Sequence, residues 1–292
     1  MNKKVKGSLA ALLCGLFYGL IPLIMLGVSR AGDVPGTVCS MYRLFFAGLL
    51  TLPIALYKIR KQPVSLRAVL NIGLVGLAGG GTAVLLYEAF ARIPSGIGIA
   101  VHYIYPLTTL LFAVTIFKEK VSKASLPAAL LVLVGVILLC DVSVLPEKPL
   151  AGILLAFASA IGCSIYYMLM EHLDTGDCDK LVFTSFMNLS GAVLMLLYNT
   201  VTGKFTARFS LSQWSFLLLA GVFMVGAVVM VAVAVKNVGT VTTTVLGTLE
   251  PIVCTVGSAL LLHDPVTPRT LLGAALILTA VVLITVVTKK NS

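Results

Sequence analysis

The sequence predicts an all-α membrane protein with ten transmembrane helices, arranged as two inverted five-helix repeats. Three observations predict this fold class. Of the 292 residues, 59% are hydrophobic and only 11% are charged, whereas soluble domains carry about 25% charged residues. Ten apolar runs approach the roughly 20 residues that a helix needs to cross a bilayer. The last five runs repeat the pattern of the first five, which indicates a duplicated unit.

The first half of the chain contains five of these runs. The first follows the basic segment around Lys3 and Lys6, and it is longer than the roughly 7–15-residue core of a cleaved signal peptide, so we expect a retained span. The third carries several glycines, which predict a close contact with another helix. The expected spans are Gly7–Val28, Thr37–Leu56, Ala68–Ala91, Gly96–Phe117 and Ala124–Cys140.

The second half contains the other five runs. An acidic stretch, Glu171–Asp179, separates the first two of them, and short polar segments separate the rest. The expected spans are Leu150–Met170, Leu181–Val201, Gln213–Val235, Thr240–Leu262 and Leu271–Val287. With these boundaries, residues 1–145 and residues 146–292 form the two five-span repeats.

The distribution of basic residues predicts the orientation in the membrane. If the N-terminus is cytoplasmic, the cytoplasmic flanks of the spans carry 14 Lys and Arg residues and the outer flanks carry six. Cytoplasmic loops of membrane proteins have such an excess, so we expect a multi-pass plasma-membrane protein with both termini in the cytoplasm. The formal charge of +10 belongs to these flanks, and we therefore expect no nucleic-acid partner.

A shift of 145 residues aligns Leu85–Ser122 with Met230–Thr267 without a gap, and Pro106 then meets Pro251. Because each half has an odd number of spans, the two halves enter the membrane from opposite sides. Inverted repeats of this kind open a site at their interface first to one side of the membrane and then to the other. The architecture therefore predicts alternating access.

The segments around these two prolines resemble a known family. Leu249–Pro251, followed by an apolar run to His263–Thr267, looks like the closing signature of EamA-domain transporters in the drug/metabolite transporter superfamily. Tyr105–Ser122 is similar to the same signature in the first half. His263 and Asp264 depart from the signature, because the family usually has Gly-Glu there. The resemblance implies a ten-helix secondary carrier with a central cavity, often an exporter of amino acids or other small metabolites.

Glu250 is the main candidate for a functional side chain. It lies about halfway along the ninth expected span, where a carboxylate costs roughly 2.5–3.5 kcal/mol and must face protein or water. The neighbouring Pro251 removes a backbone donor, which frees a carbonyl toward a cavity. Glu250 is then either a site for a substrate amine or a proton, or a structural carboxylate bound by neighbouring helices.

Two polar stripes are expected to meet at the interface between the repeats. In the fourth span, His102, Tyr105 and Thr109 share one helix face, and tyrosines in the first and sixth spans are candidate cavity walls. A structural role is the alternative for each, with His102 satisfied inside the bundle and the tyrosines in interfacial belts. The candidate substrate-binding residues are Tyr18, His102, Tyr105, Thr109, Tyr166, Thr243, Gly247 and Glu250.

Structural or coupling roles are expected for four more residues, Pro106, Pro251, Arg43 and Glu88. Arg43 lies six or seven residues inside the second span. Its side chain either pairs with Glu88 of the third span or extends outward along its own stem. Glu88 precedes Arg92 by one helical turn, so a local ion pair is an equally good interpretation of this carboxylate.

The sequence lacks the motifs of common hydrolases and ATP-driven pumps, with no GxxxxGK(S/T), no GxSxG and no HExxH. Its six cysteines include no CxxC pair, so we expect no metal site and no cofactor. We expect a transporter and not an enzyme. Its partners would be a small organic solute, the lipid bilayer and, through Glu250, protons as a coupling ion. The pattern does not define an oligomeric state.

Two other functions stay open at this point. A membrane-embedded transferase acting on a lipid substrate needs clustered carboxylates, and the acidic candidates are Glu171, Asp174, Asp177 and Asp179. A solvated linker is the simpler interpretation of that cluster. A channel needs a continuous polar pore, whereas the sparse polarity of the spans favours a small occluded pocket.

Overall fold

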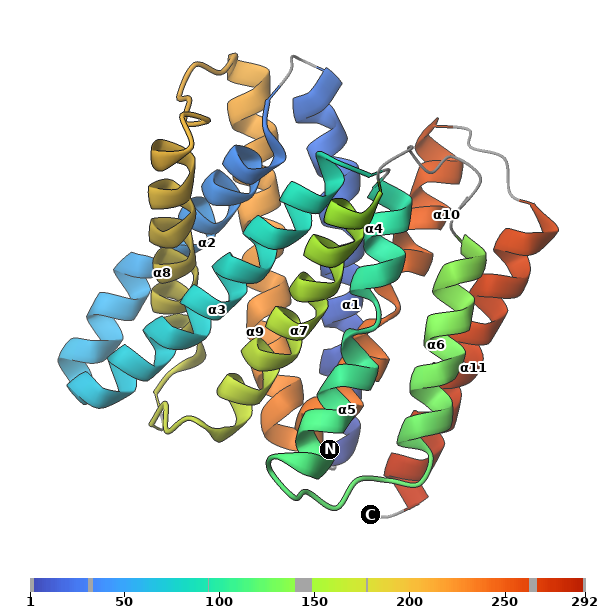
Figure 1. Ribbon diagram of the computed structural model, residues 1–292. Coiled ribbons are helices and arrows are strands. Elements are labelled where there is room, and N and C mark those ends of the chain that lie inside the picture. Colours follow the sequence, from blue (N-terminus) through green and yellow to red (C-terminus); the bar gives the residue numbers. More distant parts are fainter. Residues whose placement is uncertain are drawn as a thin grey trace.

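Eleven helices joined by short loops make up the described part of the chain, and no strand occurs within it. The structure is a computed structural model that describes residues 3–30, 34–93, 95–139, 149–176, 178–262 and 267–290. The helices (Figure 1) are α1 (Lys3–Arg30), α2 (Gly36–Lys61), α3 (Leu66–Phe90), α4 (Ser95–His102), α5 (Tyr105–Thr115), α6 (Ser125–Leu139), α7 (Leu150–His172), α8 (Lys180–Val201), α9 (Leu211–Gly247), α10 (Glu250–Leu262) and α11 (Pro268–Lys290).

The all-helical membrane character is confirmed, but the spans do not appear as ten separate helices. Seven described segments are long and apolar enough to cross a bilayer, and one of them, Leu211–Val253, extends over 43 residues. Two shorter apolar helices lie at Ser125–Leu138 and Leu271–Leu283. The fourth expected span is divided between α4 and α5, whereas α9 joins the eighth span to the start of the ninth.

The two helix breaks occur at equivalent positions in the two halves. Residues 103–104 separate α4 from α5, and residues 248–249 separate α9 from α10, which is the same 145-residue shift that aligns Pro106 with Pro251. Each proline lacks the N–H group that would bond to the carbonyl four residues earlier. Those carbonyls belong to His102 and Gly247, the last residues of α4 and α9. The aligned prolines therefore account for both breaks.

A further break lies inside α9. Gly239 has φ 75° and ψ 168°, so residues 211–238 and residues 240–247 are two helical pieces of one assigned helix. This backbone conformation is one that glycine adopts without a Cβ clash. The shift places Gly239 opposite Pro94, which lies outside the described residues.

Helices of the first half pack mainly on helices of the second half. α1 lies against α9, α2 against α8, α3 against α7 and α8, and α6 against α11 (Figure 1). A Cβ on Gly76 would collide with the Met187 carbonyl and the Ser190 hydroxyl, and a Cβ on Gly80 would lie 2.8 Å from the Gly191 carbonyl. The glycines of the third span thus form the close contact that the sequence predicts, between α3 and α8.

Candidate functional site

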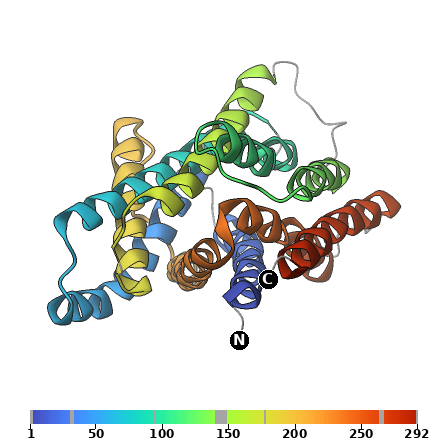
Figure 2. The ribbon, with the colours of Figure 1, turned by 90° about the horizontal axis from the view of Figure 1, so that it is seen from below.

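The two helix breaks face each other across the interface between the halves. The Tyr105 hydroxyl, at the start of α5, donates to the Thr244 carbonyl of α9 at 3.4 Å. α1 packs closely on the second break, since a Cβ on Gly15 would lie 2.7 Å from the Gly247 carbonyl, and one on Gly19 would lie 2.7 Å from the Glu250 carbonyl. The broken segments of both repeats and α1 thus converge on one region (Figure 2).

Glu250 lies at the first position of α10 and is half-buried. The Tyr103 hydroxyl is a hydrogen-bond partner of its carboxylate, and Arg43 of α2 interacts with it electrostatically. The Arg43 guanidinium donates to the Ser40 hydroxyl at 3.1 Å, and its buried Nε has no hydrogen-bond partner in the described structure. A cation of the first half and an anion of the second half therefore act on the same region without forming a direct ion pair.

Aromatic side chains form a wall beside these charges. The rings of His102 and Tyr105 lie 5.5 Å apart, and Tyr105 stacks on Tyr167 with a centroid separation of 6.0 Å and an interplanar angle of 8°. Tyr166 contacts Tyr167 edge-on at 5.1 Å and forms a hydrogen bond with Tyr18. Three of the predicted residues, Tyr18, Tyr105 and Tyr166, are thus brought together.

Gly247 is a buried residue, but there is open space next to its Cα. A Cβ built on Gly247 would meet no atom within 4 Å. The position therefore differs from Gly15 and Gly19, where a Cβ would strike backbone atoms. We refer to the region in which Tyr18, Arg43, Tyr103, Tyr166 and Glu250 interact, close to Gly247 in the chain, as the central chamber.

Three predicted site residues have local structural partners. His102 Nδ1 lies 2.8 Å from the Ser159 hydroxyl, which itself donates to the Ala156 carbonyl at 2.6 Å. Because Ser159 has only one proton to donate, His102 Nδ1 is the donor in its contact. Thr109 donates to the Ser164 hydroxyl at 3.0 Å, and Thr243 donates to the Gly239 carbonyl at 2.7 Å. These contacts match the structural interpretation of the three side chains.

Sequence reasoning missed one tyrosine of the site, Tyr103. Tyr167 was among the tyrosines of the sixth span that were expected as cavity walls. On a continuous helix, Tyr103 would point about 100° away from His102. The break at residues 103–104 changes that direction. Pro106, three residues later, is the signal from which the break follows.

Glu88 does not pair with Arg43. Its carboxylate accepts a hydrogen bond from Arg92 at 2.8 Å and another from Lys204, in the loop between α8 and α9. The hydrogen bond to Glu88 raises the pKa of Lys204 above its usual value. The local pair with Arg92, which the four-residue spacing predicted, is therefore present, and Glu88 belongs to an ion cluster away from Glu250.

The described acidic residues between α7 and α8 have structural roles. Asp174 accepts from the Gly176 N–H at 3.0 Å, and Asp179 caps α8 through the Leu181 N–H at 2.9 Å while it pairs with Lys58 at 2.5 Å. Asp177 lies outside the described residues. These partners explain Asp174 and Asp179 as capping and pairing groups.

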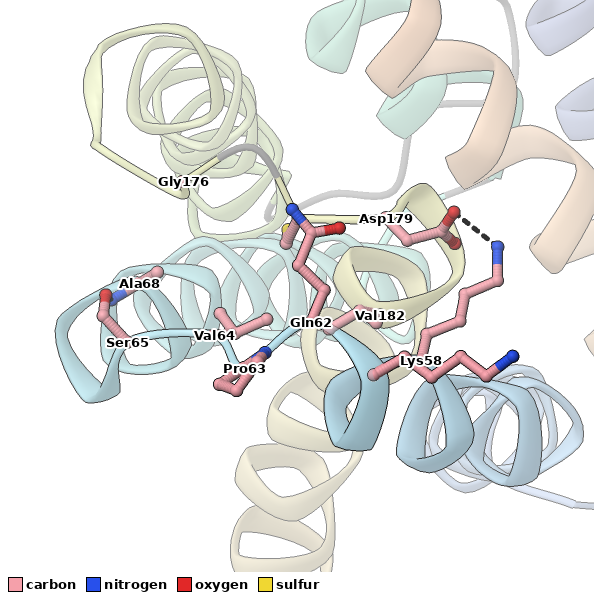
Figure 3. A pocket seen from close by; sticks show the side chains of 11 residues that line it. Lys58, Gln62, Pro63, Val64, Ser65, Ala68, Gly176, Asp179 and Val182 are labelled. Carbon is pink, nitrogen blue, oxygen red and sulfur yellow. Dashed lines mark hydrogen bonds and ion pairs between the residues drawn. The ribbon is translucent and has the colours of Figure 1, made fainter.

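A surface cavity of about 300 Å³ lies apart from the central chamber. It is lined by residues of the α2–α3 and α7–α8 loops, and Figure 3 shows Lys58 extending across it toward Asp179. None of the predicted site residues lines it. Because Lys58 and Asp179 of this cavity pair with each other, we place the candidate site at the central chamber, where Arg43 Nε lacks a partner.

The fold and the chamber define a class of protein, a helical membrane transporter built from two related halves. The chain belongs to the EamA-like transporter family, whose model matches residues 5–140 and residues 150–286. The predicted family is thus confirmed, and the match covers both repeats. The closing signature at His263–Val266 lies outside the described residues.

Comparison with solved structures supports the fold. A protein whose description reads only "Crystal structure of protein" superimposes with a TM-score of 0.81 at 19% sequence identity. The match covers 97% of this chain and 98% of the other. No curated protein matches the chain.

Proposed function

We propose that the protein is a secondary transporter that moves a small organic metabolite, an amino acid or a related solute, across the plasma membrane by alternating access. Export is the proposed direction, and both termini are assigned to the cytoplasm. The main support is the placement of Arg43 and Glu250. They come from different halves of the chain and interact without direct pairing, and Gly247, near Glu250 in the chain, has room for a Cβ.

The two charges suit a solute that carries both an ammonium and a carboxylate group. A carboxylate such as Glu250 binds an ammonium group, and a guanidinium with an unpartnered N–H group binds a carboxylate. Tyr18 and Tyr166 offer flat, largely apolar surfaces for the rest of the solute. His102, Tyr105 and Thr109 position this surface through their contacts with neighbouring helices, and Thr243 does so through its hydrogen bond to Gly239 within α9.

The proposal includes ten membrane crossings in two inverted five-helix repeats, residues 1–145 and 146–292. The 43-residue segment Leu211–Val253 would be about 65 Å long as a helix, roughly twice the 30 Å hydrocarbon core, and it contains the break at Gly239. It therefore supplies two crossings. The other six long segments and the two shorter apolar helices supply the remaining eight.

Flux in proteoliposomes tests the role of Glu250. The purified protein should exchange a radiolabelled amino acid that raises its melting temperature in a thermal-shift screen. Glu250→Gln removes the negative charge and should lower the flux at least about tenfold, because a charged hydrogen-bond partner of the solute is lost. Asp174→Asn, which changes an exposed loop carboxylate, is the control and should transport normally.

Proton coupling through Glu250 is tested in the same liposomes. A pH gradient should accelerate flux by the wild-type protein and should have no effect on the residual flux of Glu250→Gln. Equal flux by the two proteins, with and without the gradient, would remove Glu250 from the mechanism.

A further inference from the structure

The end of the molecule at which α1 begins and α11 ends is closed between the two halves. We call it the terminal end (Figure 1). Here a small apolar cluster joins α5, α7 and the second piece of α9, through Leu110, Ala113, Met168 and Val241. All four residues are buried. The cluster seals the terminal side of the interface, whereas Gly247, further along the same piece of α9, borders open space.

Polar contacts surround this cluster. His172 Nε2, at the end of α7, lies 2.8 Å from Glu119 Oε1, and the His172 ring stacks on Phe117 with a centroid separation of 3.9 Å. The neighbouring Glu171 is half-buried, and its Oε2 accepts a hydrogen bond from the Thr240 backbone N–H at 2.8 Å. α7 of the second half thus connects the loop after α5 to the piece of α9 that borders the chamber.

The Glu171 contact lies at a hinge. Thr240 directly follows Gly239, the residue with positive φ that divides α9. Its N–H is at the start of residues 240–247, where helical N–H groups have no partner within the helix. Glu171 therefore caps the helical piece that leads to Gly247 and then to Glu250, and a carboxylate also interacts favourably with the helix dipole at that position.

The repeat has no second copy of this contact. The 145-residue shift places Glu171 opposite Leu26 and His172 opposite Gly27. A leucine side chain accepts no hydrogen bond, and glycine has no side chain at all. The polar contacts of the terminal end are thus a feature of one side of the interface only.

We propose that Glu171 is a positioning residue for transport. The hydrogen bond lies within the second half, and it holds residues 240–247 so that Val241 packs on Leu110 and Ala113 of the first half while the terminal end is closed. The hydrogen bond to Thr240 breaks when that end opens. This assignment rests on the proposed alternating-access function. Loss of the contact shifts the population toward the state that is open at the terminal end, because it removes an interaction that exists only in the closed state.

Labelling of Cys163 tests the proposal without any need for transport. Cys163 is half-buried on α7 and interacts electrostatically with Glu250. We expect Glu171→Ala to increase its labelling by a membrane-impermeant maleimide from the terminal side on the order of tenfold. The reagent is added to sealed vesicles in which the orientation of the protein is known, so that it reaches only one side of the membrane. The labelled cysteine is identified by peptide mass spectrometry.

Three variants make the result specific. Glu171→Gln keeps an acceptor oxygen and should label like the wild type. Asp174→Ala, which removes a nearby exposed carboxylate that caps Gly176, should also label like the wild type. Gly239→Ala forces a Cβ to within 3.2 Å of Glu171 Oε1 at a residue with φ 75°, so it should increase labelling as Glu171→Ala does.

Specific outcomes would overturn the proposal. Unchanged labelling in both Glu171→Ala and Gly239→Ala would do so, as would equal labelling of Glu171→Ala and Glu171→Gln. Size-exclusion chromatography identifies a variant that fails to fold, and the other variants then decide. Absence of solute flux in the wild type, with the expected labelling pattern, would contradict the proposed function and leave the role of Glu171 in closing the terminal end intact.

Discussion

Arg43 and Glu250 are 207 positions apart in sequence and share the central chamber. Arg43 has a buried Nε without a hydrogen-bond partner, and an unsatisfied buried donor lowers the stability of a folded protein. Such a cost is common where a side chain is kept ready for a ligand. If Arg43 binds the solute as proposed, it has opposite effects on the stability of the unliganded protein and on solute binding.

We predict that Arg43→Gln separates these two effects. Without ligand, the variant should melt at the wild-type temperature or above it, because the unpartnered guanidinium is gone. The apparent affinity for an amino-acid ligand should fall at least about tenfold, since a charge-assisted contact is lost. Thermal-shift titrations measure both quantities. A large drop in the unliganded melting temperature would instead indicate a structural role for Arg43.

Asp179 gives a pH-dependent prediction outside the membrane. Burial raises its pKa, but the hydrogen bonds from Lys58 and from the Leu181 N–H outweigh this effect, so the net pKa is lowered. A lowered pKa in the folded state stabilises the protein above the unfolded-state pKa, which is about 3.9. That contribution disappears as the pH falls through the folded-state value.

We expect Asp179→Asn to cost less than about 1 kcal/mol at pH 7, since both side chains of the pair are partly exposed. Asparagine keeps the helix cap, so the change removes mainly the charge. The difference in melting temperature from the wild type should shrink as the pH falls below the unfolded-state pKa of about 3.9 and vanish below the lower folded-state pKa. A difference that persists there would show that the ion pair is not its source.

At the scale of helices, hydropathy located the elements but not their breaks. Within the described residues, every expected span is helical apart from the breaks and one or two residues at its ends, because the length of an apolar run follows from the membrane thickness. The breaks at residues 103–104 and 248–249 each depend on a single missing backbone hydrogen bond, and a hydropathy profile does not detect such a loss. The proximity of Arg43 to Glu250 was not predicted, because the two residues are distant in sequence and only the fold brings them together.

The glycines of α3 offer a matched pair for a packing prediction. Gly76→Ala places a methyl group against the Met187 carbonyl of α8, whereas a Cβ on Gly73 meets no atom within 4 Å. We expect Gly76→Ala to destabilise the protein by roughly 1–3 kcal/mol through overpacking. Gly73→Ala should be neutral or slightly stabilising, since alanine favours the helix. Thermal unfolding in detergent compares them, and equal effects would contradict the proposed α3–α8 contact.

At the scale of the whole molecule, the main feature is that the two halves of the chain have similar folds. Contacts between α1 and α9 have counterparts between α7 and α3, and both halves have a proline-dependent break. Two similar units in opposite orientation can exchange conformations, which makes the two access states close in energy. The side chains at the terminal end, and Arg43 with Glu250, differ between the halves, so the two halves are similar in fold but not in their charged groups.

The inverted arrangement makes a prediction from one pair of aligned loop residues. Gln62, between α2 and α3, and Ala207, between α8 and α9, are related by the 145-residue shift and are both exposed. Their loops lie at opposite ends of the molecule (Figure 1). In sealed vesicles, a cysteine at Gln62→Cys should react with an impermeant maleimide from the side of the termini, and one at Ala207→Cys should react only from the other side. Because an odd number of crossings separates aligned positions in inverted repeats, labelling of both from the same side would mean that the halves are parallel, and alternating access between mirrored units would then have no structural basis.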